Sequence, residues 1–94
     1  MFYAITAMLA SGADAKIEAM LGDFNEHLSQ PFRRLRLAGP LCDPEGLRKG
    51  FLVVIEADRI EDAETYIHES PIFKAGLYER VELFEYQIQI GTVG

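Results

Sequence analysis

His27 is the side chain in this sequence that is best suited to moving a proton, because imidazole titrates near neutral pH. It follows Phe24 by three residues and Met20 by seven, which places it at the margin of the apolar face of a helix. One hypothesis is a general acid or base at the wall of a pocket. The alternative is a half-buried structural histidine in the last helical turn, favoured there by the helix dipole. The marginal position predicts that His27→Ala leaves the fold intact.

Ser70 is the second catalytic candidate. It precedes Pro71, and this pair is typical of the start of a helical turn, which Gly76 then ends before a last strand begins at Leu77. The Ser70 hydroxyl could hydrogen-bond to His27 across this helix-to-strand junction and orient the imidazole or a substrate. The structural alternative, which the sequence favours, is that Ser70 only caps the turn. A nucleophilic Ser–His pair has no supporting nucleophile-elbow motif.

Arg33, Arg34 and Arg36 form the one basic cluster of an otherwise acidic chain. We assign Arg34 and Arg36 to substrate binding, because guanidinium groups hold anions through bidentate hydrogen bonds. The alternative is that these charges lie on the solvated edge of a strand, where they discourage pairing with other chains.

Three further residues are assigned to substrate binding. Gly39 and Pro40 end the predicted second strand and are backbone requirements there. Tyr78 follows the turn at Gly76, and its hydroxyl either enters the pocket or is hydrogen-bonded within the core.

Metal and cofactor sites are not expected. His27 and His68 each lie beside a glutamate, but the pattern places them on different helices. Cys42 is the single cysteine, which excludes an intramolecular disulfide and a cysteine-rich zinc site and fits a reducing cytoplasm.

Length and charge narrow the class of protein. The 94 residues form one domain, 1–94, and the net charge of −6 argues against a nucleic-acid partner. The apolar start lacks a basic leading segment and is too short to span a bilayer, so we expect a strand and no membrane association.

Hydrophobic periodicity predicts the order βαββαβ. The first and third strands carry apolar residues on both faces, whereas the helices are amphipathic. Capping boxes are expected at Ser11–Asp14 and Asp58–Glu61. The predicted strands are 2–9, 32–41, 51–57 and one from residue 77, and the second helix turns Ile60, Ala63 and Ile67 inward with Tyr66 on its flank. This order predicts an α+β, ferredoxin-like fold in which two helices cover one face of a four-stranded antiparallel sheet.

The uncovered face of that sheet predicts a homodimer. Two helices cannot cover both faces, and the remaining apolar surface exceeds what monomers usually expose. The apolar alternation also changes phase at Leu83–Phe84, which indicates a bulge or a tail over 84–90 that leaves its own sheet to contact the partner.

With these elements in place, the chain resembles the YciI-like (YCII-related) family. The segments that carry the resemblance are Glu26-His27-Leu28, Ala38-Gly39-Pro40-Leu41 and Ser70-Pro71-Ile72-Phe73-Lys74-Ala75-Gly76-Leu77-Tyr78. The resemblance implies a dimeric α+β barrel with a histidine–aspartate pair as the active site, and one branch of the family acts as a dehydrochlorinase. His27 matches the family histidine, whereas the aspartate position falls on Ser70, with Glu69 beside it.

Two functions follow as hypotheses. The first is a cofactor-free acid/base enzyme, a lyase, isomerase or dehydrohalogenase-like catalyst, that acts on a small aromatic or anionic molecule through His27 and Ser70. The second is a non-catalytic dimeric domain that binds a small ligand or serves as an accessory to a pathway. The absent carboxylate favours the second hypothesis, and the histidine at the pocket margin favours the first.

Overall fold

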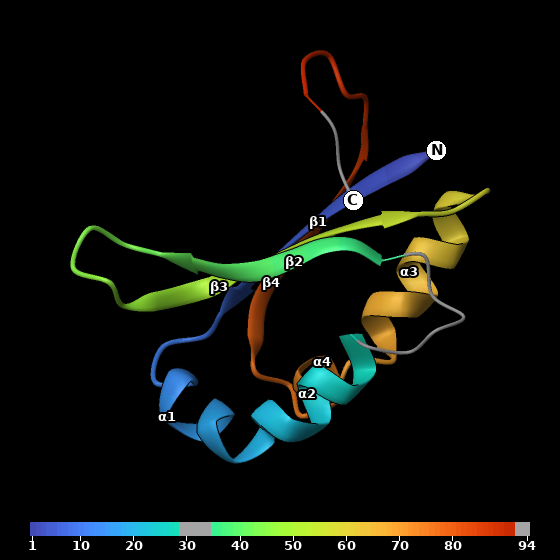
Figure 1. Cartoon of the computed structure of the whole chain (residues 1–94). Coiled ribbons are helices and arrows are strands. Elements are labelled where there is room, and N and C mark those ends of the chain that lie inside the picture. The colour runs from blue at the N-terminus through green and yellow to red at the C-terminus, as the bar shows by residue number, and fades with distance from the viewer. Residues whose placement is uncertain (29–34, 92–94) are drawn as a thin grey trace.

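The computed structural model describes residues 1–28 and 35–91, and its centre is a four-stranded antiparallel sheet (Figure 1). The strands are β1 (Phe2–Leu9), β2 (Leu35–Cys42), β3 (Arg48–Glu56) and β4 (Tyr78–Tyr86), in the spatial order β2-β3-β1-β4. Strands β1 and β3 are therefore central, which confirms the predicted ferredoxin-like α+β fold.

The helical segments gather on one side of this sheet, the lower side in Figure 1. The first helical region has three successive pieces, and the second region has two. They are α1 (Asp14–Ile17), the 3₁₀ turn η1 (Glu18–Met20), α2 (Leu21–Leu28), α3 (Ile60–His68) and α4 (Pro71–Lys74). None of the helices in the described ranges is long and apolar enough to cross a bilayer.

The core lies between the sheet and these helices. Alternate residues of the central strands point toward the helices, because side chains on a strand alternate between its two faces. The larger buried cluster joins Tyr3, Ile5, Ala7, Val53, Ile55, Ala57, Ala63, Tyr66 and Ile67. A second cluster joins Ile17, Phe24, Phe51 and Ile72 beneath the other end of the sheet.

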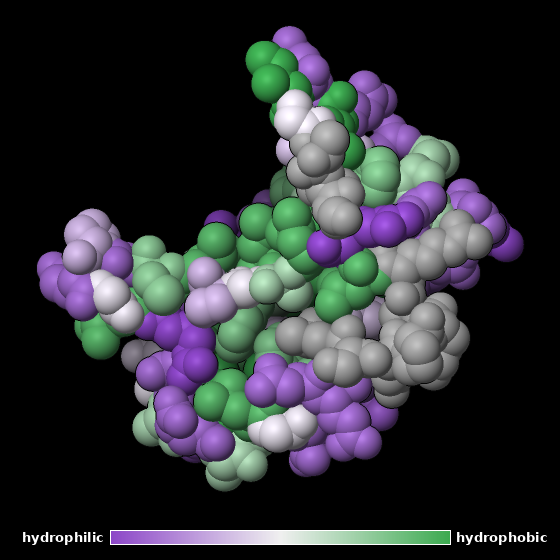
Figure 2. All heavy atoms as spheres, viewed as in Figure 1, coloured by the Kyte–Doolittle hydropathy of each residue, from purple (hydrophilic) through white to green (hydrophobic). Residues whose placement is uncertain are grey.

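The opposite face of the sheet is also apolar, as the alternation predicted. Within the described residues no helix covers it, and the C-terminal segment rises from this side in Figure 1. Figure 2 shows hydrophobic residues gathered below that segment. A shallow hollow on this face is lined by Ala4, Leu37, Leu52, Val54 and Tyr86.

Both predicted capping boxes are wrong. The N-cap residues are Ala13 for α1 and Arg59 for α3, and neither makes a side-chain cap bond. Asp14 instead lies inside the first turn, where its carboxylate binds a distant arginine. Helix α3 is also rotated from the prediction, because Tyr66 is fully buried whereas Ile60 is 39% exposed.

The irregularity of the last strand lies elsewhere than predicted. Pairing is continuous through Leu83 and Phe84, which face Ile5 and Ala4 of β1. The register shifts at the start of β4 instead, between Met8 and Leu9 of its partner strand. The phase change at Leu83–Phe84 arises because both faces of the strand carry apolar residues at that point.

The second strand is observed from Leu35 to Cys42, and the third begins at Arg48, three residues before the predicted start. Residues 32–34 of the predicted second strand lie outside the described ranges.

Candidate functional site

His27 lies in the last turn of α2, where it is packed against α3. Its side chain is 5% exposed, so the predicted marginal position is wrong, and His27→Ala would remove buried contacts. The imidazole stacks on the ring of Tyr66, with 4.6 Å between centroids, and Nε2 lies 3.1 Å from the Tyr66 carbonyl oxygen. A carbonyl oxygen only accepts hydrogen bonds, so Nε2 is the donor in this contact.

Ser70 occupies the N-cap position of α4, with Pro71 as the first helical residue, as the sequence predicted. Its backbone is extended, at φ −61° and ψ 134°, which is the usual conformation of a capping residue. Its side chain nevertheless makes no cap hydrogen bond. The residue is 1% exposed, and within the described ranges Oγ has no partner at hydrogen-bonding geometry. The hydroxyl is therefore buried without performing the capping role.

Tyr78 begins β4 and lies between the two core clusters, so both contain its neighbours. Burial raises the pKa of Tyr78 to about 12, and the negative charge of an ionised Tyr66 would raise it further. The Ser70 hydroxyl is close enough to oppose this rise in the pKa, although the two oxygens do not meet the distance and angle of a full hydrogen bond. At neutral pH, Tyr78 is consequently a protonated phenol, and among the described residues its buried hydroxyl has no hydrogen-bond partner.

The side chains described so far come from different elements. His27 is in α2, Tyr66 is in α3, Ser70 precedes α4 and Tyr78 begins β4. Helix α4 packs against both α2 and α3, and His27 of α2 contacts Tyr66 of α3, whereas the predicted hydrogen bond from Ser70 to His27 is not observed. Tyr66 connects His27 and Tyr78, since its ring stacks on His27 and it belongs to the buried cluster against which Tyr78 packs. The sequence prediction placed Tyr66 on the flank of its helix and so missed this residue. Its position three residues after the inward Ala63 was the available signal.

A hollow of about 220 Å³ opens between α2 and the strands β2 and β3. Its aromatic wall is the pair Phe24 and Phe51, whose rings are tilted and 4.8 Å apart. Gly39 and Pro40, two of the predicted binding residues, line the hollow beside Phe51, whereas His27, Ser70 and Tyr78 are not among its lining residues. The lining residues are Leu21, Phe24, Asn25, Ala38, Gly39, Pro40, Arg48 and Phe51.

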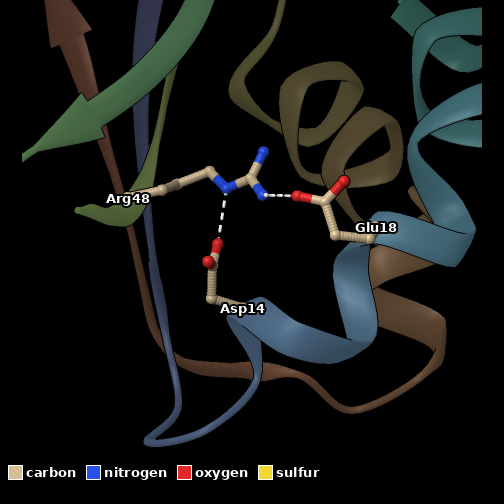
Figure 3. A network of polar contacts seen from close by, with 3 residues as sticks. All are labelled: Asp14, Glu18 and Arg48. Atoms are coloured by element: carbon tan, nitrogen blue, oxygen red, sulfur yellow. Dashed lines mark hydrogen bonds and ion pairs between the residues drawn. The ribbon is translucent and has the colours of Figure 1, made fainter. Parts of the chain in front are cut away.

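Among the described residues that line this hollow, Arg48 is the charged one, and the sequence prediction missed it. Its Nε donates to Asp14 Oδ1 at 2.6 Å, and Nη2 donates to Glu18 Oε1 at 3.0 Å (Figure 3). The hydrogen bond that Arg48 donates to Asp14 is the main cause that raises the pKa of Arg48 above its usual value. No local pattern indicates this cluster, because 34 and 30 residues separate Arg48 from its two partners.

Arg36, one of the two predicted binding arginines, does not line the hollow. Arg36 binds Glu56 of the neighbouring strand. Arg34 lies outside the described residues. Among residues 1–28 and 35–91, no group of three histidine, cysteine, aspartate or glutamate side chains could hold a metal ion.

No protein-family model matches the chain, and no curated protein sequence matches it significantly. Solved structures do match. The 5-chloro-2-hydroxyhydroquinone dehydrochlorinase TftG from Burkholderia phenoliruptrix AC1100, in complex with 2,5-dihydroxybenzoquinone, has a TM-score of 0.82 at 15% identity, covering 93% of this chain and 94% of that chain. A hypothetical protein, PHS023, from Pyrococcus horikoshii has a TM-score of 0.52 at 18% identity, covering 95% of this chain and 93% of that chain. The chain therefore shares the ferredoxin-like α+β fold of a dehydrochlorinase over nearly its whole length.

Proposed function

We propose that this chain is a YciI-like, cofactor-free acid/base enzyme that acts on a small oxygenated aromatic molecule. The observation that carries the proposal is the hydroxyl of Ser70. The residue occupies the N-cap position of α4, but its hydroxyl is buried and makes no cap hydrogen bond. Leaving a buried hydroxyl without a full hydrogen bond costs about 1–3 kcal/mol. Such a cost is typical of functional sites, where a polar group awaits a ligand.

The roles follow from the hydrogen-bonding capacity of each group. His27 would accept or return the proton, and its contact with the Tyr66 carbonyl would hold the imidazole in place. Ser70 and the protonated Tyr78 would donate hydrogen bonds to an oxygen of the substrate. Serine in place of the family aspartate means that a hydroxyl would orient the reacting group, without the charge of a carboxylate.

The dehydrochlorinase neighbour suggests a direct assay. Elimination of HCl moves one proton and releases chloride, so chloride release from 5-chloro-2-hydroxyhydroquinone would measure the reaction. We expect His27→Gln to abolish release while preserving the fold, because the glutamine amide can still donate toward the Tyr66 carbonyl. Equal release by wild type and His27→Gln would exclude His27 as the base.

The second candidate is a non-catalytic, small-ligand-binding domain. The observation that favours it is the tight packing of His27, which is stacked, hydrogen-bonded and almost fully buried. In that case phenolic ligands would raise the unfolding temperature in a thermal-shift assay, and no chloride would be released.

We further propose that the protein works as a homodimer in the cytoplasm. The apolar face of the sheet supports the dimer, since Leu37, Phe84 and Tyr86 are exposed on a surface that no described helix covers. A second copy, packed sheet against sheet, would bury these side chains. The C-terminal segment, in which Ile90 is 91% exposed, would then lie on the partner.

A further inference from the structure

We propose that Arg48 anchors the ligand in the hollow between α2 and the sheet, and that its two carboxylate partners make this site select neutral oxygenated aromatic molecules over carboxylates. The inference rests on the proposed function, and it narrows the substrate class from the aromatic or anionic molecules that the sequence predicted.

Arg48 has more hydrogen-bond donors than its two carboxylate partners engage. A guanidinium has five N–H groups, and the contacts to Asp14 and Glu18 engage Nε and one hydrogen of Nη2. Within the described residues Nη1 has no hydrogen-bond partner, and in Figure 3 it points away from Asp14. Arg48 lines the hollow, and in the proposed complex these remaining donors bind an oxygen atom of the ligand there.

The charges around Arg48 decide which ligand oxygen suits it. The cluster holds one positive and two negative groups, so an incoming carboxylate is attracted to it less than to an isolated arginine. Lys49, the adjacent cation, lies 3.7 Å from the carboxylate of Asp43 and is not part of the hollow. A carbonyl, hydroxyl or amide oxygen accepts a hydrogen bond from Nη1 without adding negative charge. The anchor therefore suits a neutral ligand.

The shape and lining of the hollow suit an aromatic ring. The aromatic pair Phe24 and Phe51 forms one wall, and Leu21 and Pro40 add apolar surface. The guanidinium carbon of Arg48 lies over the Phe51 ring, 5.9 Å from its centroid, so the donors are next to the face of this ring. The volume, about 220 Å³, is smaller than the roughly 300–1,000 Å³ typical of pockets for drug-sized ligands. A single substituted ring meets these conditions.

The test uses two probes of nearly equal shape, 4-hydroxybenzamide and 4-hydroxybenzoate, which differ in charge at pH 7. Isothermal titration of the wild-type protein should show the amide binding at least tenfold more tightly. The Glu18→Gln variant should bind 4-hydroxybenzoate about fivefold more tightly than the wild type does. Its affinity for 4-hydroxybenzamide should change by less than twofold. The Glu18 side chain is 70% exposed, so this variant should fold normally.

The control is Glu64→Gln, which removes the same charge from an exposed position of α3 outside the hollow. It should leave both affinities unchanged. Arg48→Lys should weaken amide binding at least tenfold, because an ammonium cannot keep both carboxylates and also present the planar donor pair.

Three results would overturn the inference. They are equal affinity of the wild type for both probes, an unchanged ratio in Glu18→Gln, and no binding of either probe at millimolar concentration. The chloride assay separates this inference from the proposed function. Release that depends on His27, combined with equal probe affinities, would remove only the role of Arg48. A charge-dependent affinity ratio without chloride release would leave the hollow as a binding site.

Discussion

Ser70 shows most clearly how a residue type can be predicted while its use is not. Serine before proline is a capping signature, and the backbone of Ser70 does adopt the capping conformation. The hydroxyl nonetheless remains in the interior, near the phenol of Tyr78. The choice between these two positions is a side-chain rotation, which depends on the groups that α2, α3 and β4 place around it.

Ser70→Ala tests whether this hydroxyl serves the fold. Because Oγ makes neither a cap bond nor another full hydrogen bond among the described residues, its removal should leave the free energy of unfolding unchanged or raise it by about 1 kcal/mol. Ligand binding and chloride release should fall at least tenfold. Chemical denaturation measures the first effect, and Ser11→Ala, at an exposed position, is the matched control. A loss of more than about 1 kcal/mol would contradict the proposed role, since typical cap deletions cost that much.

Tyr78 makes stability depend on alkaline pH. Its pKa is about 12 in the folded chain, above the value near 10 of an exposed phenol. Between these values the folded state holds the proton more strongly than the unfolded state, so the contribution is complete below pH 10 and is lost as pH rises toward 12. Urea denaturation from pH 9 to 11.5 should show a steeper decline for wild type than for Tyr78→Phe. Parallel curves would mean that another group governs the decline.

At the scale of elements, the sheet depends on a close approach between its two central strands. Gly50 in β3 faces Met8 of β1, and a Cβ at this position would lie 2.5 Å from the carbonyl oxygen of Ala7 and 2.9 Å from the sulfur of Met8. The backbone oxygen cannot move away without disturbing the pairing of the strands. A glycine at this position is therefore required by space.

Gly50→Ala should lower the free energy of unfolding by about 1–3 kcal/mol, the usual cost of overpacking. Gly22→Ala in α2 is the matched control, because a Cβ there meets no atom within 4 Å and alanine is the better helix former. It should raise the free energy of unfolding by about 0.5–1 kcal/mol. Thermal and urea denaturation measure both, and equal effects of the two substitutions would contradict the close approach.

At the scale of the whole molecule, the two faces of the sheet differ in how they are covered. The helices bury one face, and the other presents Leu37, Phe84 and Tyr86. In a single copy these side chains remain in contact with water, which is unfavourable in proportion to their apolar area. Association through this face would remove the unfavourable contact.

Leu37→Lys tests that association, with Ile60→Lys as its control. Both side chains are 39% exposed, but Leu37 lies on the uncovered face and Ile60 lies in α3 on the helical side. Sedimentation at micromolar concentration should show a dimer for wild type and Ile60→Lys and a monomer for Leu37→Lys. A monomeric wild type would refute the homodimer.

The fold could be predicted from the sequence because its signals are periodic. Strand alternation in β1 and β3 and helical spacing near Phe24 depend only on which residues are apolar, and burial follows that pattern along each element. The order of elements then leaves few topologies, and the ferredoxin-like arrangement is one of them. Residue type and position near the ends of predicted elements indicate His27, Ser70 and Tyr78 as candidate site residues.

The tertiary structure decided how those residues are used. It buried His27 against Tyr66, kept Ser70 from capping, and placed Arg48 between two carboxylates that are distant in the chain. These outcomes depend on contacts between elements, where rotamers and ion pairs respond to whichever groups packing brings near. Local periodicity carries no information about such partners, because it reports only the face on which each side chain lies.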